Sequence, residues 1–129
     1  MSVAAKPEGY STVSPYLVVE GAQRVIDFLQ RTFDATALRR YERSDGSVMH
    51  AEVRIGESVV MIADATGQWP AFPSMLHVYV DDVDAVYRRA LEAGGVSLQE
   101  PTQQAGDPER RGGVTDPAGN GWWIATQVE

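Results

Sequence analysis

The chain has 129 residues, of which 43% are hydrophobic and 22% are charged, and its formal net charge is -7. This length and composition suit one compact globular domain or two small fused halves. The absence of cysteine excludes disulfides, thiolate metal sites and cysteine nucleophiles. The negative charge argues against nucleic acid and anionic membranes as partners, because both bind basic surfaces.

The N-terminal segment MSVAAKPEGYSTV lacks the apolar core of a signal peptide, and no apolar run approaches the length of a membrane span. A cytoplasmic location is therefore the expectation.

The first half of the chain predicts one helix among four strands. SPYLVVEG reads as a strand that ends at Gly21, and SVVMIAD reads as another after a tight turn at Gly56-Glu57. Between them, ALRRYERS and SVMHAEVRI predict two strands joined by a turn at residues 44–46. The helix follows the first strand, and its buried face is expected at helical spacing: Val25, Phe28, Leu29 and Phe33.

The second half predicts the same succession of elements. MLHVYVDD reads as a strand, and either Asp81 or Asp82 can cap the helix that follows, which Gly94-Gly95 end. VSLQEP, RGGVTD and GWWIATQ predict three further strands, the last two joined by the turn DPAGN. The buried face of this helix is expected to comprise Val83, Val86, Tyr87, Ala90 and Leu91.

Both halves therefore follow the order strand, helix, strand, strand, strand, and equivalent residues such as Val19 and Val80 keep a constant offset. We expect a single α+β domain over residues 1–129. It would comprise a first βαβββ module at 10–66, a linker at 67–74 and a second βαβββ module at 75–129. Two curved mixed sheets, each with one helix on its back, would surround a shared cleft. The alternative is an unduplicated ferredoxin-like α+β domain.

Strand alternation assigns side chains to the two faces of each sheet. Trp122 and Trp123 are adjacent, so they point to opposite faces, and we expect Trp122 on the helix side. Tyr16 and His77 occupy equivalent positions on the first strands of the two modules, with Tyr79 on the same face as His77. In MHAEVRIG, His50, Glu52 and Arg54 share one face, while Met49, Ala51 and Val53 share the other.

Four segments carry a resemblance to the vicinal oxygen chelate superfamily, which includes glyoxalase I, bleomycin resistance proteins and dioxygenases. They are SPYLVVEGAQRVIDFLQRTF, VMHAEVRIGESVVMIAD, LHVYVDDVDAVYRRALEAGG and DPAGNGWWIA. The segments PYLVV, MHAEVRIG and LHVYVDDVDA most resemble those of the PhnB-like subgroup. The resemblance implies the glyoxalase-like fold and a homodimer, but one fold hosts many functions.

The resemblance also implies where a divalent metal would be bound in catalytic members. Its ligands would fall at Trp123 and its first-half equivalent Val60 on the last strands, and near Ser14 and Met75 on the first strands. None of these supplies the imidazole or carboxylate that such metals prefer. We therefore expect a degenerate metal site, favour no cofactor, and interpret Trp123 as occupying the carboxylate position.

These residues and the resemblance leave three alternative hypotheses for the function. The first is a small-molecule-binding protein of the bleomycin resistance type, which sequesters a cationic or aromatic compound and confers antibiotic resistance. The second is a divalent-metal-dependent lyase, isomerase or dioxygenase with a shifted site at His50, Glu52 and His77. The third is an interaction module without a ligand. The expected ligand-binding residues are Tyr16, His50, Glu52, His77, Tyr79, Trp123 and Arg110, with Trp69 as a further aromatic candidate.

The polar, Gly-rich segment QQAGDPERRGG, residues 103–113, supplies Arg110. It is either a lid or specificity loop beside the cleft or a solvated surface loop. Trp123 likewise is either a pocket residue or core packing.

Overall fold

A computed structural model describes residues 3–129, which form eight strands and two helices. The elements of the first half are β1 (Tyr16–Val19), α1 (Ala22–Phe33), β2 (Thr36–Glu42), β3 (Val48–Ile55) and β4 (Ser58–Asp64). Those of the second half are β5 (Met75–Tyr79), α2 (Val83–Glu92), β6 (Val96–Thr102), β7 (Glu109–Thr115) and β8 (Gly121–Gln127).

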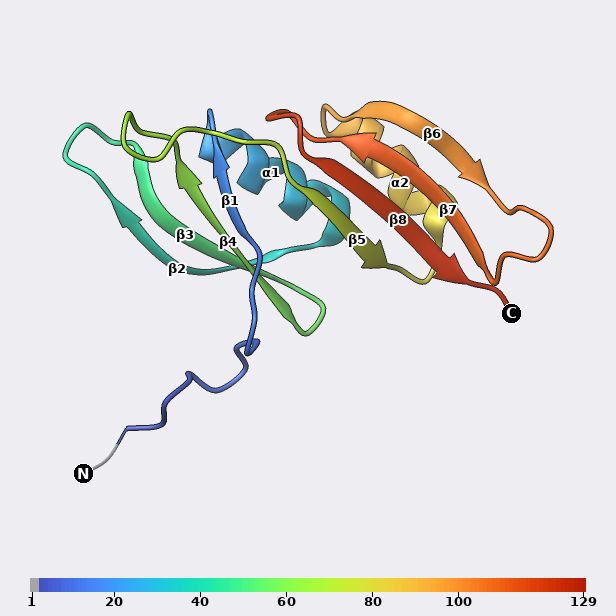
Figure 1. The fold of residues 1–129 in the computed structure, drawn as a ribbon, viewed down its shortest axis with the longest axis horizontal. Coiled ribbons are helices and arrows are strands. Elements are labelled where there is room, and N and C mark those ends of the chain that lie inside the picture. Colours follow the sequence, from blue (N-terminus) through green and yellow to red (C-terminus); the bar gives the residue numbers. More distant parts are fainter. Residues whose placement is uncertain (1–2) are drawn as a thin grey trace.

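The strands form two four-stranded mixed sheets with the same topology (Figure 1), in the orders β1-β4-β3-β2 and β5-β8-β7-β6. In each sheet the first and last strands of the module pair in parallel, and the remaining pairs are antiparallel. The predicted α+β fold of two βαβββ modules is confirmed, and the ferredoxin-like alternative, which has one sheet, is wrong.

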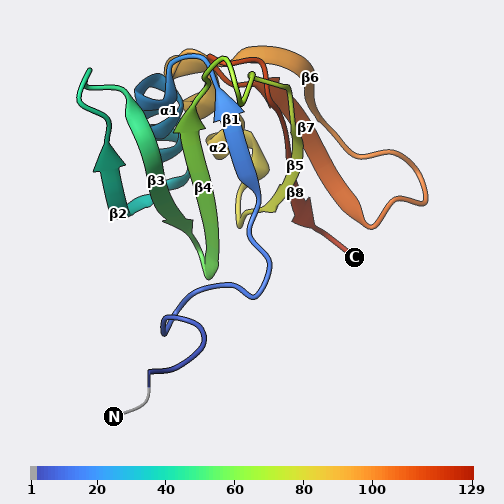
Figure 2. The same ribbon diagram turned by 60° about the vertical axis from the view of Figure 1, so that its left-hand side comes forward.

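The two helices lie together behind the sheets (Figure 2), where they pack against each other and share one hydrophobic core. Apolar residues three and four apart on α1 place Val25, Phe28 and Leu29 in this core, as helical periodicity requires. The expectation fails for Leu91 of α2, which is 38% exposed. Each sheet thus has one helix-covered face and one open face.

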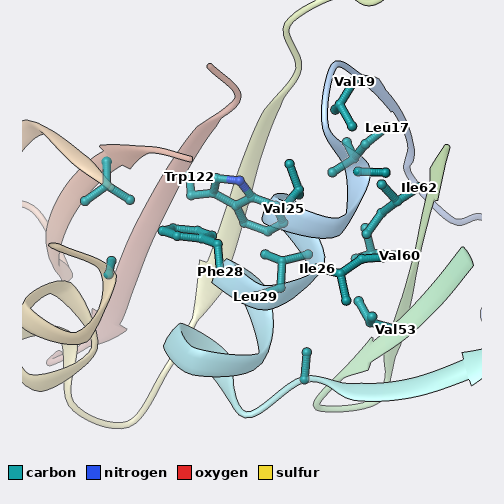
Figure 3. Close-up of a cluster of buried hydrophobic side chains, with 14 of the residues drawn as sticks. Leu17, Val19, Val25, Ile26, Phe28, Leu29, Val53, Val60, Ile62 and Trp122 are labelled. Carbon is teal, nitrogen blue, oxygen red and sulfur yellow. The ribbon is translucent and has the colours of Figure 1, made fainter. Parts of the chain in front are cut away.

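Trp122 connects the second sheet to the first helix. Its side chain is 1% exposed, and its ring lies 5.5 Å from that of Phe33 at the end of α1. Figure 3 shows it beside Phe28, at the end of the apolar cluster that α1 buries. The predicted orientation of Trp122 toward the helix side is therefore confirmed, while Trp123 is half-buried on the open face.

The turn DPAGN is organised around the buried carboxylate of Asp116. One of its oxygens accepts the backbone N–H groups of Ala118 and Asn120, at 2.8 and 3.1 Å. The other accepts the Asn120 side-chain amide and the Trp122 indole N–H, both at 2.9 Å. This turn therefore satisfies the polar end of Trp122 inside the core.

The helix starts are capped differently in the two modules. Asp82 caps α2 by accepting the N–H of Ala85, which selects it over Asp81. Gly21 precedes α1 in the left-handed conformation and has no side chain to cap it. Asp64 at the end of β4 takes that role, accepting the N–H groups of Ala22 at 2.8 Å and Val48 at 2.7 Å.

Candidate functional site

The open face of the first sheet carries a pocket of about 530 Å³ with an aromatic rim. Strands β1 and β4 form its floor, and the segment that connects the two sheets forms its wall. Most of its lining is apolar, which is typical of small-molecule sites. The lining residues are Tyr16, Val18, Arg43, Met49, Ala63, Asp64, Trp69 and Phe72.

Backbone hydrogen bonds hold the connecting segment against the pocket. Thr66 and Trp69 are bonded to each other twice, through the Thr66 N–H to the Trp69 carbonyl (2.8 Å) and the Trp69 N–H to the Thr66 hydroxyl (3.0 Å). The Phe72 N–H donates to the Val18 carbonyl on β1 at 3.3 Å. Although the backbone of Trp69 is hydrogen-bonded, the residue is 65% exposed. A turn that hydrogen bonds hold in place therefore presents a large aromatic ring beside the pocket.

Met49 reaches this pocket because of a β-bulge. The register shifts between Tyr41 and Glu42, so that His50 pairs with Tyr41 and Val48 with Glu42, and Met49 is the extra residue. Val48 is buried, and Met49 and His50 follow it on the exposed side. The predicted placement of Met49 with Ala51 and Val53 is therefore wrong.

The charged groups of the pocket are largely committed to backbone atoms. The Arg43 guanidinium donates to the carbonyls of Val48 and Asp64, each at 3.4 Å, and to the Ser47 hydroxyl at 3.1 Å. The Asp64 carboxylate accepts the two backbone N–H groups that cap α1 and begin β3. A ligand would therefore meet one positive side chain and no free carboxylate among these lining residues.

A chain of four polar side chains begins at Tyr16 in the pocket and continues along β3. The Tyr16 hydroxyl lies 2.9 Å from Nδ1 of His50, and Nε2 of His50 lies 2.8 Å from Oε2 of Glu52. The Tyr10 hydroxyl donates to Oε1 of Glu52. Glu52 is 5% exposed, so both oxygens of a buried carboxylate are hydrogen-bonded within the protein.

The N-terminal segment is held by this network. Arg39 lies over the ring of Tyr10, with 5.4 Å between the guanidinium carbon and the ring centroid, and Arg54 donates to the Gly9 carbonyl at 3.2 Å. Tyr10 was not among the residues expected from the sequence, because it lies before the first predicted element and its partner is 42 positions away.

The network predicts how stability responds to acid. Burial raises the pKa of Glu52, but hydrogen bonds from Tyr10 and His50 outweigh it and hold that pKa below its ordinary value. A lowered native pKa contributes stability above the ordinary glutamate pKa of about 4.3, and this contribution is lost as the pH falls through the native value. We expect the Glu52→Gln variant to lose less stability than the wild type as the pH falls below about 4.3. Urea denaturation at neutral and acidic pH measures this, and identical pH profiles would contradict it.

The second sheet has its own polar cluster on the open face. His77 and Tyr79 of β5 both contact Glu109, the histidine at 3.3 Å, and Arg111 donates to the same carboxylate at 3.1 Å. Hydrogen bonds from Tyr79 and Arg111 lower the pKa of Glu109, and the one to Glu109 raises the pKa of Tyr79. Glu109 lies on β7, which begins two residues before the predicted RGGVTD strand and thus within the expected loop.

Arg110 lies on the helix-covered face of the second sheet. It forms two 2.9 Å hydrogen bonds to the carboxylate of Asp84 on α2. These bonds lower the pKa of Asp84 and raise that of Arg110. We therefore do not include Arg110 in the candidate site.

Strand register corrects the equivalence proposed for Trp123. Tyr16 pairs with Met61, and its counterpart His77 pairs with Trp123, so Met61 rather than Val60 corresponds to Trp123. Val60 is buried in the core. The turn between β3 and β4 has two residues between its last paired positions, whereas the turn between β7 and β8 has five. An alignment of the two modules on their turn glycines therefore shifts β4 relative to β8.

Trp123 fills the space that a side chain on β7 would need. It pairs with Gly113, the counterpart of Glu52, and a Cβ at Gly113 would come within 2.7 Å of the indole ring. The two open faces therefore differ at this point. The first module carries a buried carboxylate, and the second carries an aromatic ring packed over a glycine.

The residues at the positions of the implied metal ligands do not fit a divalent metal, since Ser14, Met61, Met75 and Trp123 supply neither imidazole nor carboxylate. Across residues 3–129, no three His, Asp or Glu side chains are grouped so that they could hold a metal ion. His50 joins Glu52, while His77 joins Glu109. The shifted metal site at His50, Glu52 and His77 is therefore not formed.

The predicted site residues thus fall into separate groups. Tyr16, His50, Glu52 and Trp69 belong to the pocket or its network, whereas His77, Tyr79 and Trp123 lie on the second sheet. His77 and Tyr79 also line a groove of about 380 Å³ between β5 and the β3–β4 turn, which involves both halves.

Between residues 3 and 129, neither helix is long and apolar enough to cross a bilayer.

Comparisons with known proteins identify similar chains. The sequence model of the Glyoxalase/Bleomycin resistance protein/Dioxygenase superfamily matches residues 11–124. The uncharacterized protein Mb0911c of Mycobacterium bovis is 38% identical over 128 residues, covering 90% of this chain and 83% of the relative.

Solved structures agree with the fold. TioX from Micromonospora sp. ML1 superposes with a TM-score of 0.75 at 24% identity, covering 91% of this chain and 98% of TioX. TnmS3, an antibiotic binding protein from Streptomyces sp. CB03234, gives 0.69 at 20% identity and covers 92% and 99% of the two chains. At these identities, the two structures show the shared fold alone.

Proposed function

Because this chain belongs to the glyoxalase/bleomycin resistance protein/dioxygenase superfamily, we propose that it binds and sequesters a small aromatic molecule. The observation that carries this proposal is the 530 Å³ pocket at which Tyr16, Trp69 and Phe72 present exposed rings. Stacking of aromatic rings contributes about 0.5–1.5 kcal/mol per pair beyond the burial of apolar area. The neighbour TnmS3 is an antibiotic binding protein, and the family description includes bleomycin resistance protein; these support an antibiotic as the ligand and a role in antibiotic resistance.

Local charges favour an aromatic ligand over a cationic one. The overall charge of -7 would attract a cation. The pocket itself presents Arg43, however, and the nearby Asp64 and Glu52 carboxylates already accept hydrogen bonds from the protein. Cation–π attraction to the exposed rings would favour a cation, but the same rings offer stacking and burial to an aromatic ligand of either charge state.

The proposal is tested by a Trp69→Ala variant. We expect binding of aromatic compounds to weaken about tenfold, which corresponds to about 1.4 kcal/mol. The thermal midpoint should change little, because the Trp69 side chain is exposed. Calorimetric titration with a panel of aromatic natural products measures the first effect, and thermal denaturation measures the second. Trp123→Phe is the matched control on the second sheet. Unchanged affinity in Trp69→Ala would contradict the proposal.

We further propose that the metal site is degenerate and that binding needs no metal. The support is the chemistry of the residues at the ligand positions, of which Trp123 is the clearest case. Chelator-stripped protein titrated with Mn²⁺, Ni²⁺, Zn²⁺ and Fe²⁺ should show no tight stoichiometric binding, and His77→Ala should leave the metal content unchanged. Tight one-to-one binding that requires His50 and His77 would instead support the metal-dependent lyase, isomerase or dioxygenase.

A further inference from the structure

The proton positions in the network behind Tyr16 follow from the chemistry of its members. An ionised carboxylate accepts hydrogen bonds and donates none, so Nε2 of His50, 2.8 Å from Glu52, carries a proton. A neutral imidazole has one N–H, which leaves Nδ1 as an acceptor. The Tyr16 hydroxyl, 2.9 Å from Nδ1, therefore donates its proton to His50. Its oxygen is left with lone pairs that can accept a hydrogen bond.

The groups around His50 hold it in this arrangement. Tyr16 contacts it from β1, Glu52 from β3, and the ring of Tyr41 stacks on it from β2 with 6.3 Å between ring centroids. Tyr10 donates to the other oxygen of Glu52, which keeps that carboxylate from turning away. The oxygen that Tyr16 presents at the pocket is thus an oriented acceptor backed by a buried charge.

The charged side chains that line the pocket already have hydrogen-bond partners within the protein. Arg43 donates to Ser47 and to two carbonyls, and the Asp64 carboxylate accepts two backbone N–H groups. Tyr16 is 43% exposed and lines the pocket together with Trp69 and Phe72. Among the lining side chains, the Tyr16 oxygen is therefore the acceptor without a protein donor that a ring placed between these aromatic residues would meet.

We propose that the pocket selects aromatic molecules that bear a hydroxyl group, and that this hydroxyl donates a hydrogen bond to Tyr16. The inference rests on the proposed function, because the same pocket holds the ring. A methyl ether of the same ring has no proton to donate, and its oxygen would face the lone pairs of Tyr16. Hydroxyl recognition would thus come from a histidine and a glutamate that do not themselves line the pocket.

The experiment compares 2-naphthol with 2-methoxynaphthalene by calorimetric titration near pH 8. The wild type should bind the naphthol about three- to tenfold more tightly, as one net hydrogen bond gives. Tyr16→Phe should keep the affinity for the ether and lose the preference for the naphthol. Tyr79→Phe is the matched control, since it also removes one exposed, hydrogen-bonded tyrosine hydroxyl but on the second sheet, where Tyr79 donates to Glu109, and it should keep the full preference.

Glu52→Gln tests whether the hydrogen bonds from Glu52 through His50 to Tyr16 set the direction of the Tyr16 hydroxyl. The glutamine amide can donate to Nε2 of His50 and still accept from Tyr10, which moves the imidazole proton to Nδ1. Nδ1 then donates to Tyr16, and the tyrosine proton turns toward the ligand. The preference for the naphthol should disappear or reverse, although the glutamine is nearly isosteric with the glutamate.

The outcomes separate the two proposals. Equal binding of both probes by the wild type would overturn hydroxyl selection and leave aromatic binding intact. Full preference for the naphthol in Glu52→Gln would overturn the role of Glu52 and His50 in orienting the Tyr16 hydroxyl. Absence of binding for both probes would overturn the aromatic pocket and hydroxyl selection together.

Discussion

An Asp116→Ala variant should lose about 3–5 kcal/mol of unfolding free energy, which is a large part of the stability of a domain of this size. The carboxylate is 4% exposed and accepts four hydrogen bonds within the DPAGN turn and from Trp122. Removing it leaves these donors without partners, including the buried Trp122 indole N–H and the Asn120 amide. Asn120 in turn accepts the N–H of Ser74, just before β5, so the loss extends to the start of that strand.

Urea denaturation measures this loss, and two variants bracket it. Asp116→Asn keeps the size of the side chain but replaces one acceptor oxygen by an amide, and about 1–3 kcal/mol should be lost. Asp84→Ala removes the partner of Arg110 and so breaks a half-exposed ion pair, which contributes little to stability. If Asp116→Ala were no more destabilising than Asp84→Ala, the turn would not have the structural role assigned to it.

Replacement of Trp122 by alanine should also cost about 3–5 kcal/mol, because a fully buried tryptophan leaves a large cavity. The ring packs against Phe33 and fills the space between the second sheet and α1 (Figure 3). Trp123→Ala should cost no more than about 2 kcal/mol, since the residue is half-buried and packs over Gly113.

Thermal and urea denaturation of the two alanine variants test this contrast between adjacent residues. Trp122→Phe is the control for the indole N–H, because it keeps most of the packing volume and loses the hydrogen bond to Asp116. Equal losses in Trp122→Ala and Trp123→Ala would mean that Trp123 belongs to the core as much as Trp122.

Local periodicity was enough to predict the architecture. The helical spacing of Val25, Phe28 and Leu29 and the alternation around Trp122 depend on residues close in sequence, and both were confirmed. The order of elements recurs in the two halves, and this repeat predicts the two equivalent sheets. The same repeat assigns Tyr16 and His77 to equivalent strand positions.

Features that depend on distant contacts were missed. The bulge that turns Met49 to the open face arises from the register of β2 against β3, which no local pattern records. The two modules also have turns of unequal length before their last strands, which no local pattern shows. This difference makes Met61, and not Val60, the counterpart of Trp123 among the implied ligand positions. Tyr10 and Phe72 lie outside the regular elements, so their places at Glu52 and at the edge of β1 could not be predicted from periodicity.

If aromatic molecules bind at the first sheet, the indole N–H signals of the three tryptophans will report where they bind. Single Trp→Phe variants assign these signals in a ¹H–¹⁵N spectrum, and 2-naphthol is then added to the wild-type protein. We expect a progressive shift of the Trp69 signal and no shift of the Trp122 signal, because the Trp122 indole is buried and hydrogen-bonded to Asp116. A shift of the Trp123 signal with the Trp69 signal unchanged would place the ligand on the second sheet and contradict binding at the first.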